Sequence, residues 1–70
     1  MMTVRIMDQQ KNVKEIKGVT RIFTIQVKGI PAFLYYETVN DQDGYGTKVP
    51  FSKIKSWDAR ATVKGGNIQL

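Results

Sequence analysis

The sequence predicts a small all-β domain, and three observations support this prediction. Apolar and polar residues alternate with period two over several short segments, which is typical of half-buried strands. Glycine, proline, asparagine and aspartate recur between these segments and mark turns. The alternating segments are rich in β-branched and aromatic residues, which favour a pleated surface. A chain of 70 residues leaves room for one such domain with a thin core.

The first half of the chain is predicted to hold three strands. Thr3–Met7 alternates and precedes a polar turn at residues 8–12. A short strand over Val13–Ile16 follows, with a kink or bulge at Gly18, because glycine accepts irregular backbone. Val19–Val27 is the clearest strand, since seven of its nine residues are β-branched or aromatic.

One segment allows an alternative. Val13, Ile16 and Val19 recur at a spacing of three, which also fits one face of a short helix over Lys11–Lys17. Such a helix would change the class to β-rich α+β. The β-branched residues and Gly18 favour the strand, because both lower helix propensity.

The second half continues the pattern of strands and turns. Its Ala32–Val39 segment has large apolar groups on both faces, which is typical of a central or doubly covered strand. Its predicted elements are a turn at Lys28–Pro31, strands at Ala32–Val39 and Tyr45–Phe51 with a loop at 40–44 between them, a single helical turn or corner at Pro50–Ile54, a strand at Lys55–Val63 and a loose glycine-rich tail at 64–70.

Together these elements predict one small β domain over residues 1–63, followed by a C-terminal tail over 64–70. Five to six short strands in this length make a small antiparallel roll or barrel of SH3-like or OB-like size. A two-layer open sheet is the alternative. The core is expected to come from Val4, Ile6, Phe23, Ile25, Val27, Phe33, Leu34, Val49, Phe51, Ile54 and Trp57.

Composition argues against catalysis and metal binding. The chain has no cysteine and no histidine, so it lacks the usual zinc ligands and the side chains that serve as nucleophile or base near neutral pH. Asp41 and Asp43 fall in a turn sequence, where aspartate commonly bonds to nearby backbone. We therefore expect a non-enzymatic protein with no catalytic residue, no metal site and no cofactor.

The sequence also sets expectations for location. The longest apolar stretch lies near Ile30–Tyr36 and is far too short to span a bilayer. The first residues show no charged region followed by a long apolar run, so no signal peptide is expected. The predicted location is the cytoplasm of a bacterium or of an infected host cell, with no membrane partner.

Charge and aromatic residues suggest a contact surface. The net charge is +5, with six basic residues against two acids in the first 35 positions and five against four afterwards. Alternation can bury only one face of a strand, so one of the adjacent Tyr35 and Tyr36 is the best candidate for an exposed contact. The candidate contact surface comprises Tyr35, Tyr36, Tyr45, Lys48, Lys53 and Lys55.

Two stretches carry a resemblance to a known group of proteins. Residues 4–8 (VRIMD), with the polar turn and residues 13–16 (VKEI), resemble the opening of small uncharacterised proteins from phages and prophages of Gram-positive bacteria. Residues 49–57 (VPFSKIKSW) resemble their closing segment, a strand, a proline corner and a final strand. The resemblance covers about a third of the chain. It implies a β roll and a mobile-element origin, but no activity and no functional residues.

These observations favour a small binding module that acts through protein contacts or self-association, with a homodimer as one candidate assembly. The alternative function is a nucleic-acid-binding β barrel that stacks bases on tyrosine and tryptophan and contacts phosphates through lysine. The modest, dispersed charge ranks nucleic acid second, because grooves for nucleic acid need clustered lysine and arginine.

Overall fold

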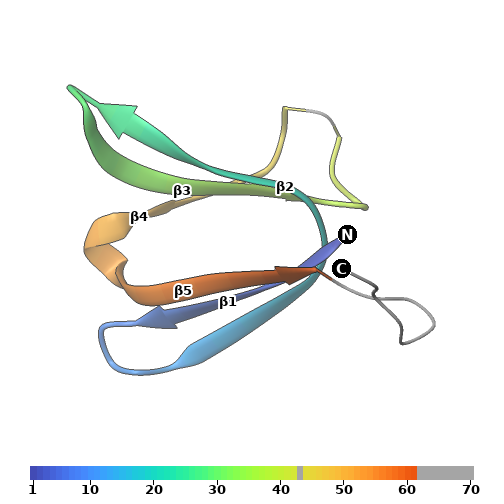
Figure 1. Ribbon diagram of the computed structural model, residues 1–70, viewed down its shortest axis with the longest axis horizontal. Helices are drawn as coiled ribbons and strands as arrows, with labels where there is room; N and C mark the ends of the chain where they lie inside the picture. The colour runs from blue at the N-terminus through green and yellow to red at the C-terminus, as the bar shows by residue number, and fades with distance from the viewer. Residues whose placement is uncertain (43, 62–70) are drawn as a thin grey trace, which may run out of the picture.

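The computed structural model describes residues 1–42 and 44–61. It confirms the predicted all-β class (Figure 1). Residues 13–17 belong to a strand, so the short helix considered for Lys11–Lys17 does not form. The elements of the described residues are β1 (Met2–Asp8), β2 (Val13–Val27), β3 (Ile30–Thr38), β4 (Thr47–Pro50), the 3-10 turn η1 (Phe51–Lys53) and β5 (Ile54–Ala61).

The five strands form one antiparallel sheet in the order β4-β3-β2-β1-β5. The 15-residue β2 is shared by both halves of the sheet, because its first part pairs with β1 and its second part pairs with β3. The sheet bends along β2, so that β1, β5 and the start of β2 lie across from β3, β4 and the end of β2 (Figure 1). Among the described residues β4 and β5 do not pair, so the roll is open and no closed barrel forms.

Local turn chemistry explains the first two hairpins. In the β1–β2 turn the Asp8 carboxylate accepts the N–H groups of Gln10 and Asn12, both at 2.9 Å. In the β2–β3 turn Lys28 and Gly29 both have positive φ, at 54° and 79°. This two-residue geometry matches the right-handed twist of the adjoining strands, and glycine adopts it without strain.

The core lies between the two halves of the bent sheet. Met2, Ile16, Ile22, Val49 and Phe51 pack against it while partly buried. The buried apolar side chains are Val4, Ile6, Val19, Leu34, Tyr36 and Ile54. Four of these six were predicted as core, whereas Val19 and Tyr36 were not.

The largest error of the sequence prediction is the face assigned to the second part of β2. The β2–β3 register shifts between Val19 and Arg21, which indicates a bulge and reverses the alternation beyond it. Val19 therefore lies in the core, while Phe23 and Val27 are 41% and 51% exposed on the outer face. Ile25 and Phe33, which pair across the same face, are only half-buried.

Trp57 corrects a second prediction. It pairs with the buried Ile6 and shares its face, yet it remains 37% exposed because β5 is an edge strand. The predicted tail at 64–70 and the last residues of the predicted strand at Lys55–Val63 lie outside the described residues. Within the described part of the chain, no helix has the length and apolar character needed to cross a bilayer.

Candidate interaction surface

The structure brings together only some of the residues predicted to form a contact surface. Tyr35 is half-buried on the outer face of β3 and pairs with the exposed Lys48 on β4. Tyr45 stands 74% exposed in the β3–β4 loop. Tyr36 points the other way and is buried in the core, so its ring is not available at the surface.

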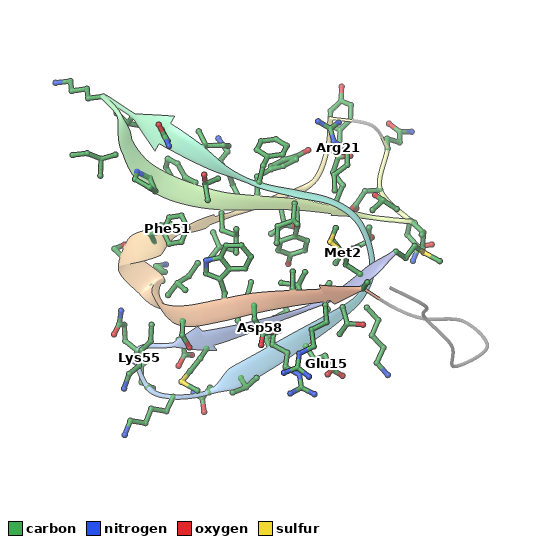
Figure 2. All side chains as sticks on the ribbon, in the orientation of Figure 1. Met2, Glu15, Arg21, Phe51, Lys55 and Asp58 are labelled. Atoms are coloured by element: carbon green, nitrogen blue, oxygen red, sulfur yellow. The ribbon has the colours of Figure 1, made fainter. Side chains whose placement is uncertain are left out.

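The two remaining lysines lie elsewhere. Lys53 is exposed on η1 and Lys55 is exposed on β5. Figure 2 shows Lys55 and Arg21 at opposite ends of the molecule. Of the predicted set, Tyr35 and Lys48 are therefore neighbours across the β3–β4 hairpin, and Tyr45 lies exposed in the loop of the same hairpin.

The outer face of β2 and β3 contains a continuous group of large side chains. Phe23 lies opposite Tyr35, and Ile25 lies opposite Phe33. The rings of Phe23 and Tyr35 pack with centroids 4.8 Å apart and a tilt of 33°. We call these four residues, Phe23, Ile25, Phe33 and Tyr35, the aromatic face.

Two cations border the aromatic face. The Arg21 guanidinium lies 5.5 Å from the centroid of the Phe23 ring, and the Lys48 ammonium lies 5.3 Å from that of Phe33. Both distances fall within the range of favourable cation–π contacts. Positive charge therefore lies over the rings at the border of the face and not at its centre.

A buried carboxylate fixes the ring of Tyr35. Glu37, which is only 4% exposed, accepts a short hydrogen bond from the Tyr35 hydroxyl and a 3.1 Å bond from the Gly44 N–H. The Tyr35 hydroxyl in turn accepts the Gly46 N–H at 3.0 Å. Arg21 lies 3.7 Å from the same carboxylate oxygen. These contacts join the β3–β4 loop to the aromatic face.

The same network shifts the ionisation of Tyr35. The Glu37 carboxylate accepts a hydrogen bond from the phenolic O–H, which favours the neutral tyrosine and raises the pKa of Tyr35 above its usual value near 10, and partial desolvation adds to the rise. The N–H of Gly46 and the charge of Arg21 oppose the rise to a smaller extent. The neutral tyrosine is thus the form that the fold favours.

This shift predicts a pH dependence of stability. Because the pKa of Tyr35 is higher in the folded protein, its contribution to the free energy of unfolding is complete below pH 10 and is lost as the pH rises through the folded pKa. Glu37→Gln removes the negative charge, so we expect the pKa of Tyr35 to fall and the alkaline loss of stability to become shallower. Tyrosine 13Cζ chemical shifts and thermal melts above pH 9 measure both effects. An unchanged Tyr35 titration in Glu37→Gln would contradict this account.

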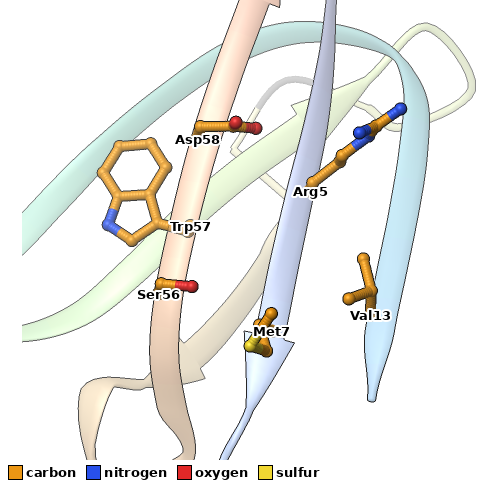
Figure 3. A pocket seen from close by; sticks show the side chains of 6 residues that line it. All are labelled: Arg5, Met7, Val13, Ser56, Trp57 and Asp58. Atoms are coloured by element: carbon orange, nitrogen blue, oxygen red, sulfur yellow. The ribbon is translucent and has the colours of Figure 1, made fainter. Parts of the chain in front are cut away.

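The other half of the sheet has a depression on its outer face. It encloses about 340 Å³ and is lined by Arg5, Met7, Val13, Ser56, Trp57 and Asp58. In Figure 3 the side chains of Ser56 and Asp58 point to the side where Arg5 lies, whereas Trp57 points to the other side of β5. Arg5 is held by Glu15 at 3.0 Å across β1 and β2, so this depression contains an internal ion pair.

Sequence reasoning missed part of this surface. Phe23 and Phe33 were assigned to the core, and Glu37 was counted only among the acids. Glu37 did leave a signal, since an acid two residues after a tyrosine on a strand shares that tyrosine's face. The bulge near Arg21 has no glycine or proline to mark it, so the exposure of Phe23 could not be predicted. Asp41 does bond to its own turn, accepting the Thr38 N–H at 2.9 Å, whereas Asp43 lies outside the described residues.

Comparison with protein-family models, with curated proteins and with solved structures gives no match for this chain.

Proposed function

We propose that this protein is a small non-enzymatic binding module that acts by protein–protein contact, with a second copy of the chain as the partner. The observation that supports the proposal is the aromatic face, a group of large side chains left partly exposed on the outside of the sheet. Exposed apolar patches of this kind mark interaction surfaces in soluble proteins. Phenylalanine, tyrosine and arginine are also the residue types that interfaces favour.

The charges around the face fit a second copy. Arg21 lies beside Glu37, so much of its charge is neutralised within one chain. Lys48 is then the main charge that a facing copy meets, and it lies on the edge strand β4. Two such faces can meet through their apolar centres with little repulsion. The fixed Tyr35 ring also loses little conformational freedom on binding.

The area of the aromatic face sets the expected affinity of the dimer. The aromatic face spans three residues on each of two neighbouring strands, which is about 10 by 10 Å, or roughly 100 Å². Stable interfaces bury roughly 800 Å² on each partner. We therefore propose a weak, concentration-dependent dimer.

The test is the mass of the protein in solution. Sedimentation and light scattering from tens of micromolar to about millimolar concentration should show a rise toward the dimer mass. Phe23→Glu should abolish this rise, because it replaces an apolar ring of the aromatic face with a negative charge. Val13→Glu is the matched control, since Val13 is also an exposed apolar residue of β2 but lies on the other half of the sheet. A monomer at all concentrations would overturn the proposal.

Nucleic-acid binding is the second candidate, and one observation favours it. Arg21 and Lys48 both lie over phenylalanine rings, which combines charge with a stacking surface. Binding to mixed-sequence single- and double-stranded DNA and RNA at low and moderate salt decides between the two functions. Micromolar binding that weakens steeply with salt, in a protein that stays monomeric, would favour this candidate.

An origin in a phage or prophage stays a prediction.

A further inference from the structure

We propose that the groove between the two halves of the sheet binds an extended acidic peptide segment, which adds as a strand to the free edge of β2. This surface is separate from the aromatic face, so the inference does not rest on self-association. Three features support it, namely an open groove with an apolar floor, a strand edge beside it and two lysines at its rim. Within residues 1–42 and 44–61 this edge is unpaired and the two lysines form no ion pair.

The groove lies where the β1–β2 turn approaches β4 and η1. It encloses about 280 Å³, which is just below the usual size of small-molecule sites. Core side chains form the floor of the groove, and polar side chains form its rim. The groove can therefore hold a few side chains of a bound peptide while the peptide backbone stays at the strand edge. The lining residues are Ile6, Asp8, Asn12, Val13, Lys14, Tyr36, Thr47, Val49 and Lys53.

The first part of β2 has a free edge at this groove. Residues 13–17 pair with β1 on one side, and among the described residues no strand pairs with them on the other. Asp8 donates its N–H to the Asn12 carbonyl at 3.0 Å. This bond shows which residues of the β1–β2 ladder direct their backbone groups toward each other. Alternation then directs the backbone groups of Lys14 and Ile16 toward β1 and those of Val13, Glu15 and Lys17 outward. An incoming strand would bond to these last three residues.

The charge at the groove selects the occupant. No described carboxylate forms an ion pair with Lys14 or Lys53. Asp8, the acid at the rim, already accepts two N–H groups of its own turn. A second copy added along this edge would bring its own lysines against Lys14 and Lys17, which is how natural edge strands resist self-pairing. An acidic strand avoids this repulsion between lysines and can place carboxylates near Lys14 and Lys53.

The probe is a fluorescent seven-residue peptide that alternates aspartate with valine, compared with one that alternates lysine with valine. We expect the acidic peptide to bind in fluorescence anisotropy and to shift the 15N–1H resonances of residues 13–17 and 47–49. The lysine peptide should not bind. Resonance shifts confined to the aromatic face, or equal binding of the two peptides, would overturn the proposal.

Two sets of changes test the contacts. Lys14→Glu and Lys53→Glu should each weaken binding about tenfold, because each converts an attraction into a repulsion. Lys28→Glu makes the same change of charge at the β2–β3 turn and should leave the affinity within about twofold. If all three variants weakened peptide binding equally, the loss of affinity would come from the net charge of the protein. That result would contradict a binding site in the groove.

Backbone methylation tests the added strand. Peptides N-methylated on alternate residues fall into two series, and only one series directs its N–H groups toward β2. That series should lose binding, whereas the other should keep it. Equal binding by both would contradict strand addition. Repeating the titration in Phe23→Glu keeps this test apart from self-association, because that substitution leaves the groove intact.

Discussion

Leu34→Ala is expected to destabilise the protein by about 3 kcal/mol, which is a large part of its total stability. Leu34 is fully buried on the inner face of β3 and is the largest of the completely buried side chains. It pairs with Thr24 on β2 and with Val49 on β4, so its loss leaves a cavity between three strands. Small domains have roughly 0.05–0.15 kcal/mol of stability per residue, which gives about 3.5–10 kcal/mol for this chain.

Urea unfolding followed by Trp57 fluorescence measures this loss. The midpoint should fall sharply while the slope of the transition stays constant. Ile30→Ala is the matched control, because Ile30 is an equally large residue of β3 but is mostly exposed. It should change the free energy of unfolding by less than about 0.5 kcal/mol. A similar cost for both variants would show that burial at position 34 is not what stabilises β3.

Gly46→Ala is the second large effect that we expect, because the loop before β4 has no room for a side chain there. A Cβ at position 46 would lie 2.2 Å from the Tyr36 carbonyl oxygen, 2.7 Å from Cγ of Glu37 and 2.9 Å from Cζ of Tyr35. The first of these atoms belongs to the backbone of a central strand and cannot move cheaply. Overpacking of this kind costs about 1–3 kcal/mol, and we expect the upper end.

The substitution should also disturb the aromatic face. Moving the loop away from β3 breaks the bond from the Gly46 N–H to the Tyr35 hydroxyl and weakens the network around Glu37. Gly44→Ala is the control in the same loop. Its φ of +84° strains an alanine, but nothing lies within 4 Å of its added Cβ, so we expect a cost of about 1–2 kcal/mol and an unchanged Tyr35 titration. Thermal melts and tyrosine 13C shifts distinguish the two variants. Equal melting temperatures and equal Tyr35 titrations in both variants would contradict the predicted clash at position 46.

The order of strands and turns was predictable from sequence because each is encoded locally. Val19–Val27 was recognised from β-branched and aromatic content, and the single turn after Pro50 from the fixed φ of proline. The main change of boundary is that the two strands predicted on either side of Gly18 form one strand. Gly18, with a φ of +71°, lets the chain bend there without ending the ladder.

Which side of each strand faces the core was less predictable, because it depends on pairing between distant segments. One extra residue near Arg21 transfers Phe23 from the predicted core to the outer face. The sequence did show that Tyr35 and Tyr36 must face opposite ways, but not which of them faces outward. That choice follows from the register of β3 against β2, where Tyr36 lies opposite Ile22 and Tyr35 opposite Phe23.

The pairing of β1 with β5 has a consequence for how fast the chain folds. Three of the four strand pairs join neighbours along the chain and can form as local hairpins. The fourth joins Met2 to Ala61 and closes nearly the whole chain into a loop. Closing a long loop costs conformational entropy before the new contacts offset it, so non-local pairs slow folding. We therefore expect the docking of β5 to be the slow step of folding, and until β5 docks one edge of β1 is unpaired.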